Sequence, residues 1–242
     1  MTSEADAVSG IAAALAAGKV RDAIEQAEAA ADRGVTHPDL AFDRGVAYVR
    51  RAHGADSRPG DLGRAAAAFE ETLSLRPGDT EAARALELVR EEAARRRARA
   101  GGTVDVVEGP GLARTAVTVM PEPAWEAMAV VSSLALALAW PARRLPRALR
   151  SAYVIAAVAA IALGLSASAL AVLRHTRATV EVGVVIDDVA RLSSRDPRGA
   201  VELPEGARID VLGRQGAEVR VRWGGREGTL PATAVRVIGR AR

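Results

Sequence analysis

The amino-acid sequence predicts a multi-domain fold in three parts: an α-helical region, a transmembrane hairpin of two helices and a small all-β barrel. Residues 9–98 repeat apolar side chains at helical spacing, two long uncharged runs follow, and from Thr179 onward apolar residues alternate with a period of two. Aromatic residues make up only 3% of the 242 residues, which favours several small modules over one large core. The expected domains are residues 1–98 (helical), 99–124 (linker), 125–173 (hairpin) and 179–239 (barrel).

The composition argues against an enzyme. The chain has no cysteine, which removes disulfides, cysteine-based zinc sites and a thiol nucleophile, and its three histidines lie far apart without metal-ligand spacing. No P-loop, zinc-protease, serine-hydrolase or dinucleotide-binding motif occurs. We therefore expect no catalytic residue, no cofactor and no metal ion. The basic clusters at residues 95–99 and 143–150 lack aromatic neighbours suited to stacking on bases, so nucleic acid is not an expected partner.

Two uncharged runs predict the membrane segment. Residues 151–173 are 23 residues without a charge, and about 20 apolar residues suffice to cross a bilayer. Residues 127–142 form a shorter run of 16, which Trp125 and Trp140 bracket as interfacial aromatic residues do. Tyr153 is expected at the same interface as Trp140. We therefore predict spanning helices over about 125–142 and 151–173; the alternative is one spanning helix preceded by an interfacial one.

The turn between the two runs sets the expected orientation, because it carries Arg143, Arg144, Arg147 and Arg150. Short arginine-rich loops stay cytoplasmic, so the domains before and after the hairpin are expected together on the periplasmic side of a bacterial inner membrane. The acidic start MTSEADAVSG has no basic signal-peptide region, which conflicts with export unless the true start lies elsewhere.

Small residues repeat every four positions in the second run. They are Ala156, Ala160, Gly164 and Ser168. Such a stripe lets another helix approach closely, and the first helix of the same hairpin is the expected neighbour. The alternative is that an alanine-rich composition produces the stripe by chance.

The helical region contains a G-x2-Y element, an A-x3-F element and then a proline. These elements are supplied in order by Gly45, Tyr48, Ala65, Phe69 and Pro77. The pattern resembles the tetratricopeptide (TPR) repeat, in which two antiparallel helices pack together. The resemblance implies that Gly45 and Ala65 let the helices meet while Tyr48 and Phe69 fill the space around the contact. Residues 51–59 form an insertion expected as an exposed loop; a generic helical bundle is the alternative.

TPR domains bind partners through the concave face formed by the first helix of each repeat. Helical periodicity places four residues of the helix over about 39–51 nearest that face: Phe42, Val46, Val49 and Arg50. Together they would form a short groove for an extended peptide or a partner helix. The alternative is that Phe42 and Val46 pack as core against residues 18–30.

The C-terminal region predicts short strands joined by tight turns. Turn signals fall at residues 204–206, 214–216 and 224–225, and VRVRWGGREGTL is a strong hairpin pattern. Five or more strands in about 60 residues are typical of a small barrel, and the order resembles a bacterial SH3 domain. Trp223 is the one aromatic residue of this region; it alternates with Val219 and Val221 and is expected in the core, with Arg220 and Arg222 on the solvated face.

The order of these parts resembles the BatE family, the TPR proteins of the bacterial aerotolerance (Bat) operon. Short stretches of the sequence also resemble this family, at residues 42–48 (FDRGVAY), 60–65 (GDLGRA) and 75–79 (LRPGD). The resemblance covers residues 36–240. It implies an inner-membrane scaffold that works beside von Willebrand A-domain Bat proteins and a MoxR-type ATPase. The sequence thus predicts a membrane-anchored adaptor for protein–protein interactions. The alternative is a cell-envelope module whose SH3-like barrel binds peptidoglycan.

Overall fold

The computed structural model describes residues 4–101, 122–142, 149–179, 181–193 and 201–238. Within these ranges the chain forms seven α-helices, one short 3₁₀ helix and seven strands, a mixed α/β architecture. It divides into two compact units, Met1–Val107 with Glu181–Arg242 and, between them in sequence, Glu108–Val180. We call the first the α/β unit and the second the helical pair.

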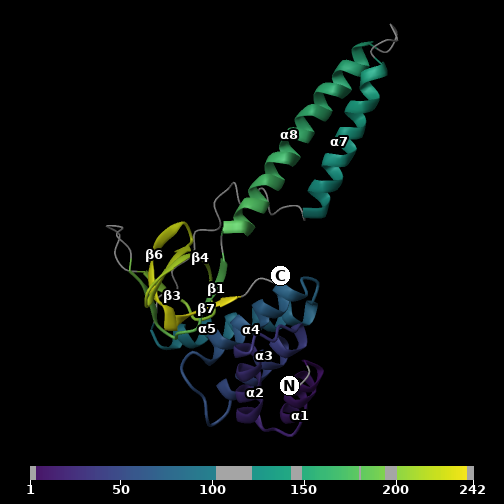
Figure 1. The fold of residues 1–242 in the computed structure, drawn as a ribbon. Coiled ribbons are helices and arrows are strands. Elements are labelled where there is room, and N and C mark those ends of the chain that lie inside the picture. The colour runs from purple at the N-terminus through teal and green to yellow at the C-terminus, as the bar shows by residue number, and fades with distance from the viewer. Residues whose placement is uncertain (1–3, 102–121, 143–148, 180, 194–200, 239–242) are drawn as a thin grey trace. The chain divides into compact units, whose positions relative to one another are not determined.

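Five helices form the first part of the α/β unit (Figure 1). They are α1 (Glu4–Ala16), α2 (Val20–Asp32), α3 (Pro38–Ala52), α4 (Asp61–Leu75) and α5 (Thr80–Arg99). Each packs on the next along the chain. The breaks between the helices fall at glycine and proline, because these residues do not readily continue a helix. Asp79 begins α5 by accepting hydrogen bonds from the amides of Glu81 (3.1 Å) and Ala82 (3.0 Å).

The strands form a five-stranded antiparallel sheet and a separate two-stranded ribbon. They are β1 (Glu181–Val185), β2 (Ala190–Leu192), β3 (Val201–Leu203), β4 (Arg208–Gln215), β5 (Glu218–Trp223), β6 (Arg226–Pro231) and β7 (Val235–Ile238). The sheet order is β6-β5-β4-β1-β7, and β2 pairs with β3. The predicted hairpins at residues 216 and 224–225 join β4–β5 and β5–β6. Trp223 lies in the core at 8% exposure, as predicted, while Arg220 and Arg222 are exposed.

The helices and the sheet share one core. Val184 of β1 and Ile238 of β7 belong to the same buried apolar cluster as the helical side chains Leu62 and Phe69. Val185, the next residue of β1, points instead into the core of the sheet, because successive side chains of a strand face opposite sides. The regions that the sequence treats as a helical domain and a separate barrel are therefore packed against each other.

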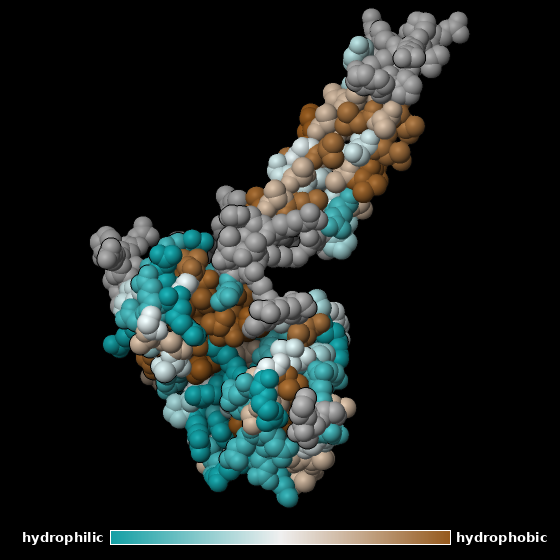
Figure 2. Space-filling view, viewed as in Figure 1, coloured by the Kyte–Doolittle hydropathy of each residue, from teal (hydrophilic) through white to brown (hydrophobic). Residues whose placement is uncertain are grey.

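The helical pair consists of α7 (Glu122–Ala142) and α8 (Leu149–Thr179), which pack along each other (Figure 1). Among the described residues, one helix is long and apolar enough to cross a membrane, over Tyr153–Val172 of α8. The apolar stretch of α7, Pro123–Ala139, is shorter. Large apolar side chains face outward, for example Val130 at 68% exposure and Ile161 at 65%, and Figure 2 shows an apolar surface along both helices. An outward-facing apolar surface is typical of a helix in contact with lipid.

The small-residue stripe of α8 is a wrong prediction except at its first residue. Ala156 is buried, but Ala160, Gly164 and Ser168 are exposed. The buried positions are instead Ala156, Ala159, Ser166 and Ala169. Their spacing of three, seven and three residues follows the periodicity of an α-helix, whereas a strict four-residue repeat advances about 40° around the helix at each step. The stripe therefore rotates away from α7.

The residues expected at the membrane interface are only partly described. Trp125 is half-buried and Tyr153 is 55% exposed. Arg143, Arg144 and Arg147 lie outside the described residues, as do the side chains of Trp140 and Arg150.

Candidate functional site

The residues expected to pack the TPR-like pair lie at or beside the contact between α3 and α4. Gly45 of α3 faces Phe69 of α4 so closely that a Cβ on Gly45 would lie 2.6 Å from the ring. Phe69 is 2% exposed, and both Tyr48 and Ala65 are buried. Pro77 follows the end of α4 at Leu75. The Phe69 ring fits against α3 because position 45 has no side chain.

The predicted concave-face residues take part in the core and in a helix cap. Phe42, Val46 and Val49 are half-buried and pack against the helical cluster. The Phe42 ring lies 5.5 Å from that of Phe69, centroid to centroid, with a tilt of 59°. Arg50 is exposed and donates a hydrogen bond of 2.6 Å to the carbonyl oxygen of Leu15, at the end of α1. Phe42 and Val46 therefore belong to the core rather than to an open groove, and the ring contact of Phe42 is made with α4.

A buried arginine joins three elements of the α/β unit. Arg44 of α3 is fully buried, pairs closely with Glu71 of α4 and lies 3.9 Å from the carboxylate of Glu28 of α2. Glu28 also accepts hydrogen bonds from the Tyr48 hydroxyl (2.8 Å) and from Arg236 of β7 (2.8 Å). Arg44 is not among the residues predicted from the sequence, although its spacing from the buried positions 41, 48 and 52 places it on the inner face of α3.

The titration behaviour of this cluster indicates a structural role. Burial alone raises the pKa of Glu28, but the guanidinium groups of Arg236 and Arg44 outweigh burial and hold it below its ordinary value. Burial and the Glu28 carboxylate raise the pKa of Tyr48 to about 12. At neutral pH Glu28 is therefore ionised and Tyr48 protonated, so the cluster clamps α2, α3 and β7 together.

A second set of contacts holds the sheet against α4 and α5. Gly60, the residue before helix α4, has no side chain to cap the helix. Glu205 supplies a cap by accepting a 2.7 Å hydrogen bond from the amide of Gly63. Burial raises the pKa of Glu205. Arg97 of α5 pairs with Glu202 at 2.8 Å, and Arg90 donates to the carbonyl oxygen of Gly206 at 3.2 Å. No local pattern predicts such pairs, since the partners are more than 100 residues apart in sequence.

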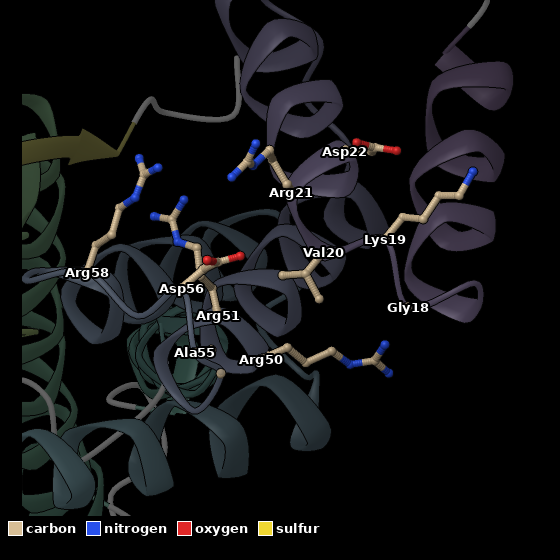
Figure 3. A pocket seen from close by; sticks show the side chains of 11 residues that line it. Gly18, Lys19, Val20, Arg21, Asp22, Arg50, Arg51, Ala55, Asp56 and Arg58 are labelled. Atoms are coloured by element: carbon tan, nitrogen blue, oxygen red, sulfur yellow. The ribbon is translucent and has the colours of Figure 1, made fainter.

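A basic pocket of 420 Å³ opens between the α1–α2 turn, the end of α3 and the loop that follows it (Figure 3). Its lining residues are Gly18, Lys19, Val20, Arg21, Asp22, Arg50, Arg51, Gly54, Ala55, Asp56 and Arg58. The predicted insertion at residues 51–59 forms one wall and is exposed over most of its length. Both ends of this loop are fastened to the buried carboxylate of Asp61, which accepts hydrogen bonds from the Arg51 guanidinium and from the Arg58 amide. The loop is thus a fixed wall of the pocket.

The described residues contain no group of three or more His, Asp or Glu side chains placed to hold a metal ion. Comparisons of the chain with protein-family models, with curated proteins and with solved structures found no match.

Proposed function

We propose that this chain is a non-enzymatic, membrane-anchored adaptor for protein–protein interactions. In this proposal α1–α5 are a TPR-like domain, the β strands are an SH3-like barrel, and α7–α8 are a two-span hairpin. The observation that carries the proposal is that the α/β unit is built from chain on both sides of an apolar helical pair. Such a unit is a protein domain held at the bilayer by a hairpin anchor.

The shared core bears directly on the number of membrane crossings. Residues before α7 and residues after α8 meet in one core, so both must lie on the same side of the membrane. A chain that crosses through α8 must therefore cross a second time. The 17 residues of the apolar stretch in α7 span roughly 26 Å as a helix, close to the ~30 Å of a bilayer core, and local thinning accommodates the difference.

Reporter fusions test this topology. We expect fusions after residue 101 and after residue 242 to report the same compartment, and a fusion at Pro146 to report the opposite one. Neutral residues in place of Arg143, Arg144, Arg147 and Arg150 should scramble the orientation, because the charge bias of the turn is then lost. Opposite compartments for the two ends would mean an odd number of crossings and would overturn the hairpin.

The orientation and the partners follow from the turn and from the resemblance in domain order. In the proposed orientation the arginine-rich turn lies in the cytoplasm, and the α/β unit lies on the periplasmic side of a bacterial inner membrane. We propose von Willebrand A-domain Bat proteins, acting with a MoxR-type ATPase, as the partners.

Isolation of the native complex tests the adaptor function. The full chain and a matched anchor-only chain, residues 102–180, are each cross-linked in cells and purified in mild detergent. We expect the same von Willebrand A-domain proteins to accompany the full chain in stoichiometric amounts and to be absent from the anchor. Recovery of an identical set with both chains would show that the α/β unit recruits nothing.

Peptidoglycan binding has less support from the β region. Protein sites for sugars and peptides commonly use exposed aromatic rings, and Trp223 is the only aromatic residue that follows Tyr153 in the sequence. Its side chain is buried in the core of the sheet. The adaptor is therefore the function that the geometry favours.

A further inference from the structure

Within the described part of the chain, the basic pocket carries unpaired positive charge, whereas arginines at the contact between helices and sheet are paired with carboxylates. Five cationic side chains line it against two carboxylates, Asp22 and Asp56. Arg51 is bonded to Asp61, and Arg50 to a carbonyl oxygen. Among the residues that the structure describes, the side chains of Lys19, Arg21 and Arg58 lie within ion-pairing distance of no carboxylate. By contrast, arginines at the helix–sheet contact, such as Arg97 and Arg236, are paired.

Three of the guanidinium groups converge from three elements. Arg21 of α2, Arg51 of α3 and Arg58 of the following loop also line an adjoining hollow of 380 Å³. Figure 3 shows these three side chains pointing toward one region, while Arg50 points away from them. Like charges brought together repel, whereas a guanidinium fork donates two parallel hydrogen bonds to a carboxylate. A carboxylate placed between Arg21 and Arg58 would relieve the repulsion and satisfy both donors.

We infer that the basic pocket binds an acidic segment of a protein partner. One side-chain carboxylate lies between Arg21 and Arg58, and a second lies near Lys19. The inference rests on the proposed adaptor function and names the chemistry of the segment that the adaptor recognises. The two adjoining hollows have the size of ordinary ligand sites, about 300–1,000 Å³.

The remaining lining residues restrict the segment further. Gly18, Gly54 and Ala55 leave room for a peptide backbone, and the Val20 side chain offers an apolar contact. Glu25 lines the adjoining hollow and would repel a long acidic run. The second carboxylate of that hollow, Glu28, is engaged by Arg236 and Tyr48. The segment therefore carries two or three carboxylates, flanked by neutral or basic residues.

A fluorescein-labelled, end-blocked triglutamate peptide tests the site on the purified full chain in neutral detergent. We expect saturable binding at low salt, no binding of the matched triglutamine peptide, and a loss of about tenfold or more in affinity for Arg21→Glu with Arg58→Glu. The matched control is Arg33→Glu with Arg84→Glu, which makes the same charge change at two exposed positions outside the pocket. Circular dichroism confirms that both variants are folded.

Each other outcome overturns the inference or part of the function. Equal losses in the two double variants would indicate non-specific attraction, and displacement by an equal concentration of inorganic phosphate would indicate a simple anion site. Binding to phosphatidylglycerol vesicles through Arg21 and Arg58, without binding of the peptide, would assign the pocket to a membrane surface. If the peptide fails to bind while partners still co-purify through the α/β unit, the inference about the pocket is wrong and the proposed adaptor function is unaffected. If the peptide binds while no partner co-purifies, the proposed adaptor function is wrong.

Discussion

Phe69→Ala is expected to destabilise the α/β unit by about 3–5 kcal/mol, the usual cost of removing a buried aromatic ring. Phe69 is 2% exposed and packs between the backbone of Gly45 and the ring of Phe42. Since Gly45 has no side chain, little can move into the cavity that the substitution leaves. Urea unfolding of the full chain in mild detergent, followed by circular dichroism, measures the loss.

Gly45→Ala tests the contact between Gly45 and the Phe69 ring directly. Alanine favours a helix over glycine by about 1 kcal/mol, but a Cβ at position 45 would lie only 2.6–2.9 Å from three atoms of the Phe69 ring. We therefore expect Gly45→Ala to destabilise the parent by about 1–3 kcal/mol through overpacking. In the Phe69→Ala background the same change should be neutral or stabilising, because the ring is gone. Additive effects of the two substitutions would mean that the two residues are not in contact.

The sequence predicts those parts of the fold that depend on neighbours along the chain. Helices begin and end where glycine and proline interrupt the periodic pattern, as at Pro77, and the Gly224–Gly225 turn joins two alternating strands. The Gly45–Phe69 contact can also be predicted from the sequence, because the G-x2-Y and A-x3-F pattern that indicates it lies on two helices adjacent in the chain.

The sequence does not reveal which face of the sheet packs on which helices. The alternation of Val182 and Val184 predicts a strand, but nothing local shows that this face of β1 packs on helices. The cap that Glu205 gives to the amide of Gly63 joins residues 142 positions apart. The buried Arg44 is equally hidden, since arginine is ordinarily a surface residue and its carboxylate partner Glu71 lies on another helix.

The basic pocket illustrates the same limit for the candidate site. Its charged side chains come from the α1–α2 turn, from the end of α3 and from the loop after it, and in sequence they are diluted among many other arginines. Only their convergence distinguishes Arg21 and Arg58 from arginines on solvated helix faces. The predicted groove on α3 rests on the TPR resemblance and on helical periodicity, and neither says whether Phe42 faces solvent or a neighbouring ring.

Gly63→Leu is expected to separate the sheet from helix α4. A Cβ on Gly63 would lie 2.7 Å from the carbonyl oxygen of Val185 and 2.8 Å from the Cα of Ile186. Both are backbone atoms, so the clash is relieved only if β1 moves. Moving the strand exposes Val184 and Ile238, and exposing two buried aliphatic side chains costs about 3–6 kcal/mol in total. Helix α4 itself should persist, because leucine is a better helix former than glycine.

An engineered disulfide reports this separation, because the chain has no native cysteine. A Cβ on Gly206 would lie 3.2 Å from the Cβ of Ala66, just under the roughly 3.5–4.5 Å of a disulfide, so Ala66→Cys with Gly206→Cys should cross-link α4 to the turn before β4 on oxidation. The cysteine at position 206 carries backbone strain in every variant alike, because φ there is +77°. Gly78→Leu is the matched control, since its Cβ would meet no atom within 4 Å. We expect cross-linking in the parent and in Gly78→Leu, and its loss in Gly63→Leu. If all three variants cross-link equally, α4 does not meet the sheet at Gly63. The two ends of the helical pair would then not be held in one core.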